Sequence, residues 1–178
     1  HGQPLALVFD YLGIAIAELA NISERRLERM VNPQLSSGLP AFLVQNPGIN
    51  SGFMIVQYSA ASLVSENKVL AHPASVDSIP SSANQEDHVS MGTIGARKAT
   101  EILKNARQVI AMEIFAACQA IDLRGDNGLG LKTKRAYNKV REYIQFIEND
   151  EIMYPSIHTI KDLIESDELY DHIFKEDK

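Results

Sequence analysis

The sequence predicts an all-α fold, a bundle of long helices. Apolar residues recur at helical spacing through three long segments, and no alternation typical of a strand persists anywhere. The third of these segments covers about 35 residues, roughly 50 Å of helix at 1.5 Å per residue. Because a helix of that length exceeds what a small globule can cover, the pattern favours an extended bundle.

Composition excludes several classes of protein. The chain has 178 residues, of which 45% are hydrophobic and 22% charged, as in a globular domain able to bury a core. The net charge of -6 leaves no basic face for nucleic acid. A single cysteine, Cys118, excludes an intrachain disulfide and favours a cytoplasmic location. Asp10, Glu18 and Glu113 interrupt the apolar runs, so we expect no membrane span.

The first helix is expected over residues 4–31. Between Leu5 and Leu19 its apolar residues cover nearly the whole circumference, which predicts a helix buried among others. An irregular loop follows over 32–52, where three prolines exclude a continuous helix. The apolar AFLV in its middle predicts that this loop packs against the rest of the protein.

The remaining pattern predicts further helices separated by loops. The expected helices cover 53–70, 88–123, 131–148, 157–166 and 167–175. Glycines at 125, 128 and 130 end the third helix. We therefore expect a central long-helix bundle segment at 1–124 and a small C-terminal helical segment at 125–178.

One polar stretch, SSANQEDHVS at 81–90, stands before the third helix. Ser82 and Gln85 have the spacing of a capping box, and Glu86 and Asp87 suit the positive end of a helix dipole. A cap needs only one or two of these polar groups, however. A carboxylate held here could also bind a cationic or hydrogen-bonding substrate, or move a proton.

Other candidate sites carry less weight. Glu86, Asp87, His88 and His72 are metal-ligand types, but the sequence has no pair of histidines at i and i+4, so we predict no metal site. The serines at 36 and 37 lack the glycine pattern of a nucleophile elbow. Three further residues lie on apolar helical segments and are expected in the core: Tyr11, Tyr58 and Cys118.

Long stretches resemble the C-terminal part of the histidine ammonia-lyases, in the aromatic amino-acid ammonia-lyase family. The segment from PAFLVQNPGINSGF to SSANQEDHVSMGTIGARK carries the resemblance, and GLGLKTKRAYNKVREYIQFIENDEIMYPSI is similar to the family's tail. The opening HGQPLA resembles the end of an Asn-Phe-His-Gly motif. Sister enzymes typically carry Asn-Gln-Asp-Val, whereas this chain has Asn84-Gln85-Glu86-Asp87-His88, which points to histidine as substrate.

This resemblance implies deamination of L-histidine to urocanate and ammonia by a cytoplasmic homotetramer with a fumarase/aspartase-like fold. It assigns Glu86 to the carboxylate that faces the substrate imidazole and Gln85 to the hydrogen-bond network of the active site. It also assigns His1, in the opening motif, to substrate binding. The family's electrophile is a methylidene-imidazolone (MIO) formed from Ala-Ser-Gly.

The chain departs from the family in one large respect, because Ala-Ser-Gly does not occur in it. We expect it to correspond to about the C-terminal third of such an enzyme and to be inactive alone. Two alternatives stay open. One is a sister ammonia-lyase or aminomutase acting on tyrosine or phenylalanine, and the other is a non-catalytic helical assembly module.

Overall fold

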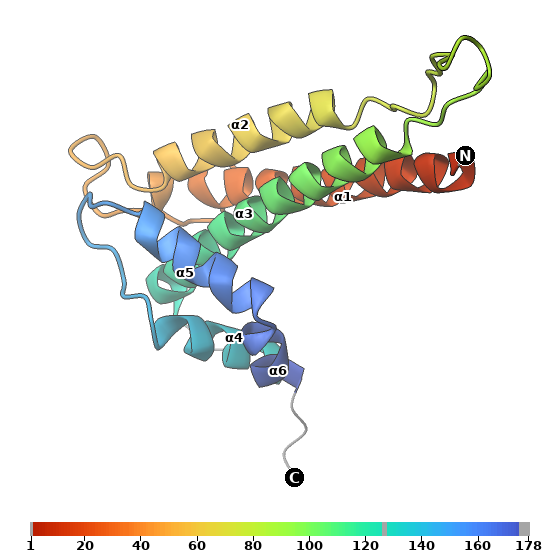
Figure 1. The fold of residues 1–178 in the computed structure, drawn as a ribbon. Coiled ribbons are helices and arrows are strands. Elements are labelled where there is room, and N and C mark those ends of the chain that lie inside the picture. Colours follow the sequence, from red (N-terminus) through yellow and green to blue (C-terminus); the bar gives the residue numbers. More distant parts are fainter. Residues whose placement is uncertain (1, 126–127, 175–178) are drawn as a thin grey trace. The chain divides into compact units, whose positions relative to one another are not determined.

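A computed structural model describes residues 2–125 and 128–174, and within these ranges every regular element is helical. The helices are α1 (Gln3–Val31), the 3-10 turn η1 (Ala41–Leu43), α2 (Met54–Leu70), α3 (Gly92–Arg124), α4 (Leu131–Arg141), α5 (Tyr154–Glu165) and α6 (Glu168–Phe174) (Figure 1). The predicted all-α class is therefore confirmed.

Two compact units divide the chain. Unit 1 consists of His1–Ile22 and Ser62–Ala106, and unit 2 consists of Ser23–Ala61 and Arg107–Lys178. The boundary of each unit cuts through α1, α2 and α3. The separate division expected near residue 125, between a bundle segment and a C-terminal segment, stays a prediction.

In unit 1, small residues let α1 and α3 approach closely. A Cβ atom at Gly13 would lie 3.2 Å from the Ile102 side chain, and one at Gly92 would lie 3.5 Å from the Cβ of Ala6. Ala6 and Ile102 are fully buried. Close backbone approach of this kind allows tight packing and fixes the two helices against each other.

In unit 2, the core forms around a pair of aromatic rings. Phe53 and Phe115 pack edge to face with ring centroids 4.8 Å apart, and both are fully buried. Leu43 and Val44, from the apolar AFLV, are fully buried, as the sequence predicts. Cys118 is also buried, and burial raises the pKa of its thiol to about 11, so it behaves as a core residue.

The first half of α1 is not covered as predicted. Leu5 is 62% exposed, Leu19 is 61% exposed and Tyr11 is 75% exposed. Tyr58 on α2 is exposed as well. The expectation that α1 is buried among helices, and that both tyrosines lie in the core, is wrong for the residues described, because no described segment covers these faces.

By length and composition alone, α1 could cross a membrane, in spite of Asp10 and Glu18. The prediction from sequence that no segment could span a membrane is therefore not met when helices are judged by length and hydropathy. The core helix of a soluble protein satisfies the same criteria, so the finding does not indicate a membrane location by itself.

Three helix boundaries differ clearly from the prediction. The helix α3 begins at Gly92 rather than His88, and the N–H of Val89 before it donates to Ser78 Oγ (3.0 Å). The helix α4 ends at Arg141 rather than residue 148, and the N–H of Ile147 in the segment after it donates to Gln119 Oε1 (3.1 Å). The helix α5 begins at Tyr154 rather than residue 157.

Candidate functional site

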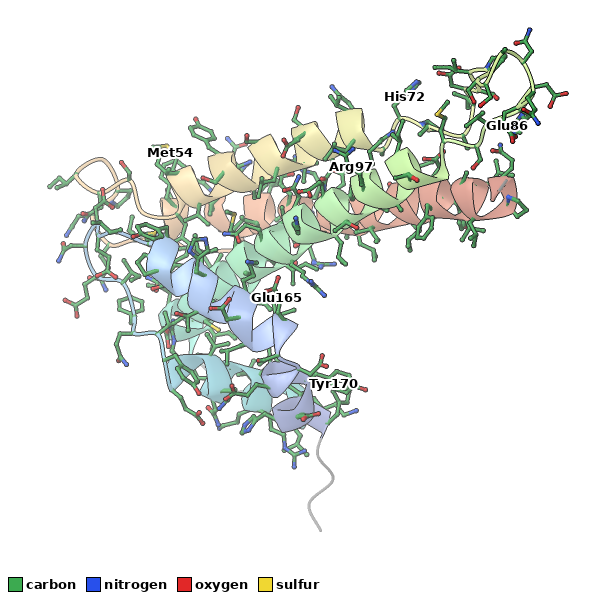
Figure 2. The ribbon with its side chains drawn as sticks, viewed as in Figure 1. Met54, His72, Glu86, Arg97, Glu165 and Tyr170 are labelled. Carbon is green, nitrogen blue, oxygen red and sulfur yellow. The ribbon has the colours of Figure 1, made fainter. Side chains whose placement is uncertain are left out.

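The loop at 71–91 connects α2 to α3 within unit 1 and carries Gln85 and Glu86. Figure 2 shows His72 where the loop leaves α2 and Glu86 farther along it. Glu86 is half-buried, whereas Gln85, Asp87 and His88 are exposed. The resemblance assigns both Glu86 and Gln85 to the site, and of the four side chains Glu86 is the one that the fold partly withdraws from solvent.

The tip of this loop is a tight turn closed by the main chain. The N–H of Ser81 donates to the Glu86 carbonyl (3.0 Å), and the N–H of Glu86 donates back to the Ser81 carbonyl (3.3 Å). Three consecutive residues in between, Ser82, Ala83 and Asn84, have φ values of 53°, 55° and 66°. Left-handed backbone costs about 1–2 kcal/mol per L-residue, and strain of this kind concentrates at functional sites.

The capping-box interpretation of Ser82 and Gln85 is wrong. No helix begins at these residues, and the Gln85 N–H donates instead to the Ser82 carbonyl (3.1 Å) within the turn. Glu86 lies six positions before Gly92, the first residue of α3, so the dipole of that helix does not hold it. Main-chain turn bonds explain the position of Glu86, and the side-chain cap does not exist.

The base of the loop is fastened to α1. The N–H of Ser75 donates to Asp10 Oδ2 (2.7 Å), and Gln3 Nε2 donates to the Ser75 carbonyl (3.2 Å). Asp10 is only 8% exposed although it is a carboxylate in an apolar stretch. The main-chain N–H and carbonyl groups of Ser75 are therefore both bound by side chains of α1.

Two more hydrogen bonds stiffen the loop. Lys98 Nζ, from α3, donates to the His72 carbonyl where the loop begins. Ser78 Oγ accepts the N–H of Val89, which joins the incoming limb of the loop to the outgoing limb (3.0 Å). The loop is thus tied to both helices of unit 1 and across itself.

The charge of Asp10 is stabilised by its surroundings. Burial would raise the pKa of this carboxyl group, but hydrogen bonds from Ser75 and from the Ala74 backbone, together with the charge of Lys98, lower it below its usual value. Asp10 is therefore ionised at neutral pH, and a charged acceptor makes a stronger hydrogen bond to Ser75 than a neutral one.

Sequence reasoning missed Asp10 and Lys98 as site residues. The signal for Asp10 was present, because an acidic residue within an apolar helical run needs a buried partner. His1, which the resemblance assigns to substrate binding, lies outside the described residues. No group of metal-ligand side chains forms within the described ranges 2–125 and 128–174.

Unit 2 contains a separate cavity of about 660 Å³. Its walls include Arg26, Arg29, Arg124 and Glu113, and none of its lining residues belongs to unit 1. Arg26 is paired with Glu113, and Arg124 donates to the Ser36 carbonyl (2.7 Å). Two of the three arginines thus already have partners within unit 2. The serines at 36 and 37 also line this cavity, whereas Gln85 and Glu86 do not.

Known proteins share both the sequence and the fold. A histidine ammonia-lyase 1 from Fusobacterium nucleatum is 61% identical over 98% of this chain. The chain spans about a third (34%) of that relative's length. A crystal structure of histidine ammonia-lyase from Trypanosoma cruzi is 47% identical, covers 97% of this chain and superposes with a TM-score of 0.93, the match taking 34% of that structure.

A tyrosine aminomutase from Streptomyces globisporus is also similar. It is 40% identical, covers 97% of this chain, gives a TM-score of 0.94 and is itself matched over 33% of its length. These neighbours share the helical fold predicted from the resemblance to the fumarase/aspartase-like enzymes. The sequence profile of the family described as Aromatic amino acid lyase matches residues 1–142. The chain belongs to the aromatic amino acid lyase family.

Proposed function

We propose that this chain is part of a histidine ammonia-lyase, which converts L-histidine to urocanate and ammonia by non-oxidative deamination. One observation carries the proposal: identity to a curated histidine ammonia-lyase is 61%, whereas identity to the tyrosine aminomutase of nearly equal coverage is 40%. The fold alone does not separate the two activities, because their TM-scores are 0.93 and 0.94.

Glu86 is the residue that we assign to the substrate imidazole. A carboxylate accepts a hydrogen bond from an imidazole N–H, and it attracts the imidazole ring electrostatically when the ring is protonated. Glu86 is half-buried, so the interaction is less screened than at a fully exposed position. Gln85 supplies an amide that can both donate and accept in the surrounding network, and His1 completes the contribution of this chain to substrate binding.

The electrophile of the reaction comes from residues outside this chain in our proposal. Ala-Ser-Gly is absent from the 178 residues, so they cannot form methylidene-imidazolone. When bound, that group supplies the electrophile for removal of the amino group. The residues described here would bind and orient histidine beside it, and the same chain alone would lack turnover.

The exposed apolar face of α1 supports an assembled enzyme. Leu5, Val8 and Leu19 are each more than half exposed and lie on one side of the helix, and an exposed apolar patch of this kind is typical of a protein–protein contact. We infer a homotetramer in the cytoplasm, as in the family that the sequence resembles, with no nucleic acid and no membrane among its partners.

Substitution of Glu86 by Gln in the full-length protein tests the proposal. Because a hydrogen bond to a charged group contributes about 1.5–3 kcal/mol, kcat/KM for histidine should fall by about 10-fold to 150-fold. The melting temperature should change by no more than about 2 °C, as for a surface substitution. Turnover is measured by urocanate absorbance.

Asp87→Asn is the matched control, because it removes an exposed carboxylate beside Glu86. Its turnover should stay within about twofold of the parent enzyme. Equal losses of turnover and melting temperature in Glu86→Gln would contradict a role in substrate binding and would indicate a structural role only.

An aminomutase or lyase acting on tyrosine or phenylalanine is the second candidate, because the tyrosine aminomutase is 40% identical over 97% of this chain. A panel of histidine, tyrosine and phenylalanine, with ammonia and β-amino acid as readouts, separates these functions. Ammonia released from histidine alone supports our proposal. Turnover of none of the three would favour a non-catalytic helical module.

A further inference from the structure

We infer that Asp10 is a positioning residue, which fixes the loop at 71–91 on α1 and thereby sets the place of Glu86. The inference rests on the proposed function, because it concerns the same carboxylate. Asp10 binds Ser75, which precedes Glu86 by eleven residues in the same loop, so in this inference Asp10 acts on Glu86 through the loop backbone.

The anchoring bond is short, charged and buried. Asp10 Oδ2 accepts the Ser75 N–H at 2.7 Å, and the side chain is 8% exposed. The carbonyl of Ser75 accepts a hydrogen bond from Gln3 Nε2 at 3.2 Å. With both sides of its backbone bound to α1, Ser75 has little freedom to shift, so it is the fixed point of the loop.

From Ser75 a series of hydrogen bonds leads toward Glu86. The N–H of Asp77 donates to the Ala74 carbonyl at 3.2 Å, and the Asp77 side chain accepts the N–H of Ser78 at 2.8 Å. The Ser78 hydroxyl then accepts the N–H of Val89 on the outgoing limb. Both limbs that flank the Ser81–Glu86 turn are therefore held by one connected network.

Gly95 on α3 leaves room for the Asp10 carboxylate. A Cβ atom added at Gly95 would lie 3.3 Å from Asp10 Oδ1, so a larger residue there would crowd the carboxylate. Lys98, three residues farther along α3, stabilises the Asp10 charge electrostatically and also donates a hydrogen bond to the His72 carbonyl. The start of α3 thus accommodates the carboxylate, and Lys98 holds the beginning of the loop.

The substitution Asp10→Asn tests the inference, because it keeps the shape of the side chain and removes its negative charge. In the full-length enzyme kcat/KM for histidine should fall about 10-fold to 100-fold. In a Glu86→Gln background the same change should cost less than about threefold, because there is no longer a charge at position 86 to misplace.

A structural role gives a different result. If Asp10 only stabilises the fold, the two substitutions reduce kcat/KM by independent factors that multiply, and this outcome overturns the inference while the proposed function stands. Asn105→Ala is the matched control from the same unit, since Asn105 binds Glu66 and Asn67 away from the loop. Its effect should be the same in both backgrounds.

A second readout does not depend on the substrate. Hydrogen exchange of the backbone amides at 75, 86 and 89 should be at least about 10-fold faster in Asp10→Asn, whereas amides of 107–124 should be unchanged. Lys98→Met should produce the same pattern with a smaller effect, which covers the case in which Asp10→Asn folds poorly. Unchanged exchange in the loop overturns the inference.

The two proposals can fail separately. If the parent enzyme releases no urocanate from histidine, the proposed function fails, and exchange still shows whether Asp10 holds the loop. If Glu86→Gln is impaired but Asp10→Asn exchanges like the parent, the positioning role fails alone.

Discussion

At the scale of single residues, buried polar side chains bind the backbone of segments that are distant in sequence. Gln119 on α3 is the clearest case in unit 2, being fully buried. Its amide donates to the carbonyls of Leu43 (3.1 Å) and Ile147 (2.8 Å), and its oxygen accepts the Ile147 N–H (3.1 Å). One side chain therefore satisfies three backbone groups of two irregular segments.

Replacement of Gln119 by Leu should be strongly destabilising. It keeps a similar volume but leaves these three backbone groups without partners, and each unsatisfied buried group costs about 1–3 kcal/mol. We expect the free energy of unfolding to fall by about 2–4 kcal/mol after partial relaxation, measured by urea denaturation. Gln145→Leu, at an exposed position, should change it by less than about 0.5 kcal/mol.

The assignment of Glu86 to the substrate stays a prediction, but the predicted capping box beside it is wrong. Ser82 and Gln85 have capping spacing, and spacing alone cannot show that Ser82, Ala83 and Asn84 adopt left-handed backbone. Such a conformation is rare for L-residues and depends on the rest of the loop. The hydrogen bonds of Asp10 were equally hidden, since Ser75 is 65 positions away.

At the scale of elements, helical periodicity predicted the long helices well. The structure places α1 and α2 within one residue of the expected bounds. The largest errors occur at the start of α3 and the end of α4, next to segments whose backbone binds distant side chains, as Ile147 binds Gln119. Local pattern carries no information about such partners, so it cannot show how these segments are held.

The start of α2 is likewise set by a distant residue. Asp150 accepts the N–H groups of Ser51 (2.8 Å) and Gly52 (2.7 Å), just before the first residue of the helix, Met54. These backbone hydrogen bonds lower the pKa of Asp150. A carboxylate at this point satisfies donors that the helix itself cannot and interacts favourably with its dipole.

We expect Asp150→Ala to lower the melting temperature at pH 7, and the difference from the parent to vanish in acid. The pKa of Asp150 in the folded state lies below its unfolded value of about 3.9. The ionised carboxylate therefore stabilises the fold fully above about pH 3.9, and this stabilisation is lost as the pH falls through the folded-state pKa. Thermal melts from pH 7 to pH 2 measure this. Glu151→Ala, at the adjacent exposed carboxylate, is the control, and a difference that persists in acid would contradict the role of the charge.

At the scale of the whole molecule, the chain matches only part of its relatives. It spans about a third of the length of its curated relatives, and its sequence contains no Ala-Ser-Gly. The apolar face of α1 was predicted to be buried, and sequence could not show that no described segment of this chain covers it.

The isolated 178-residue chain should therefore release no urocanate from histidine. It should also self-associate in water, because Leu5, Leu19 and Tyr11 expose apolar surface. Urocanate absorbance and sedimentation velocity measure the two properties. Turnover by the pure chain would refute our assignment of the electrophile to residues outside it. A monodisperse monomer would contradict the prediction that the exposed apolar face of α1 drives self-association.

The turn between Ser81 and Glu86 has a consequence for how the family diversifies. Its closure uses amide and carbonyl groups that every amino acid except proline possesses, so residues at 85 and 86 can be exchanged while the tip keeps its shape. Side chains at this tip can therefore change without a change of backbone. Relatives named for different reactions do retain one scaffold, with TM-scores of 0.93 and 0.94.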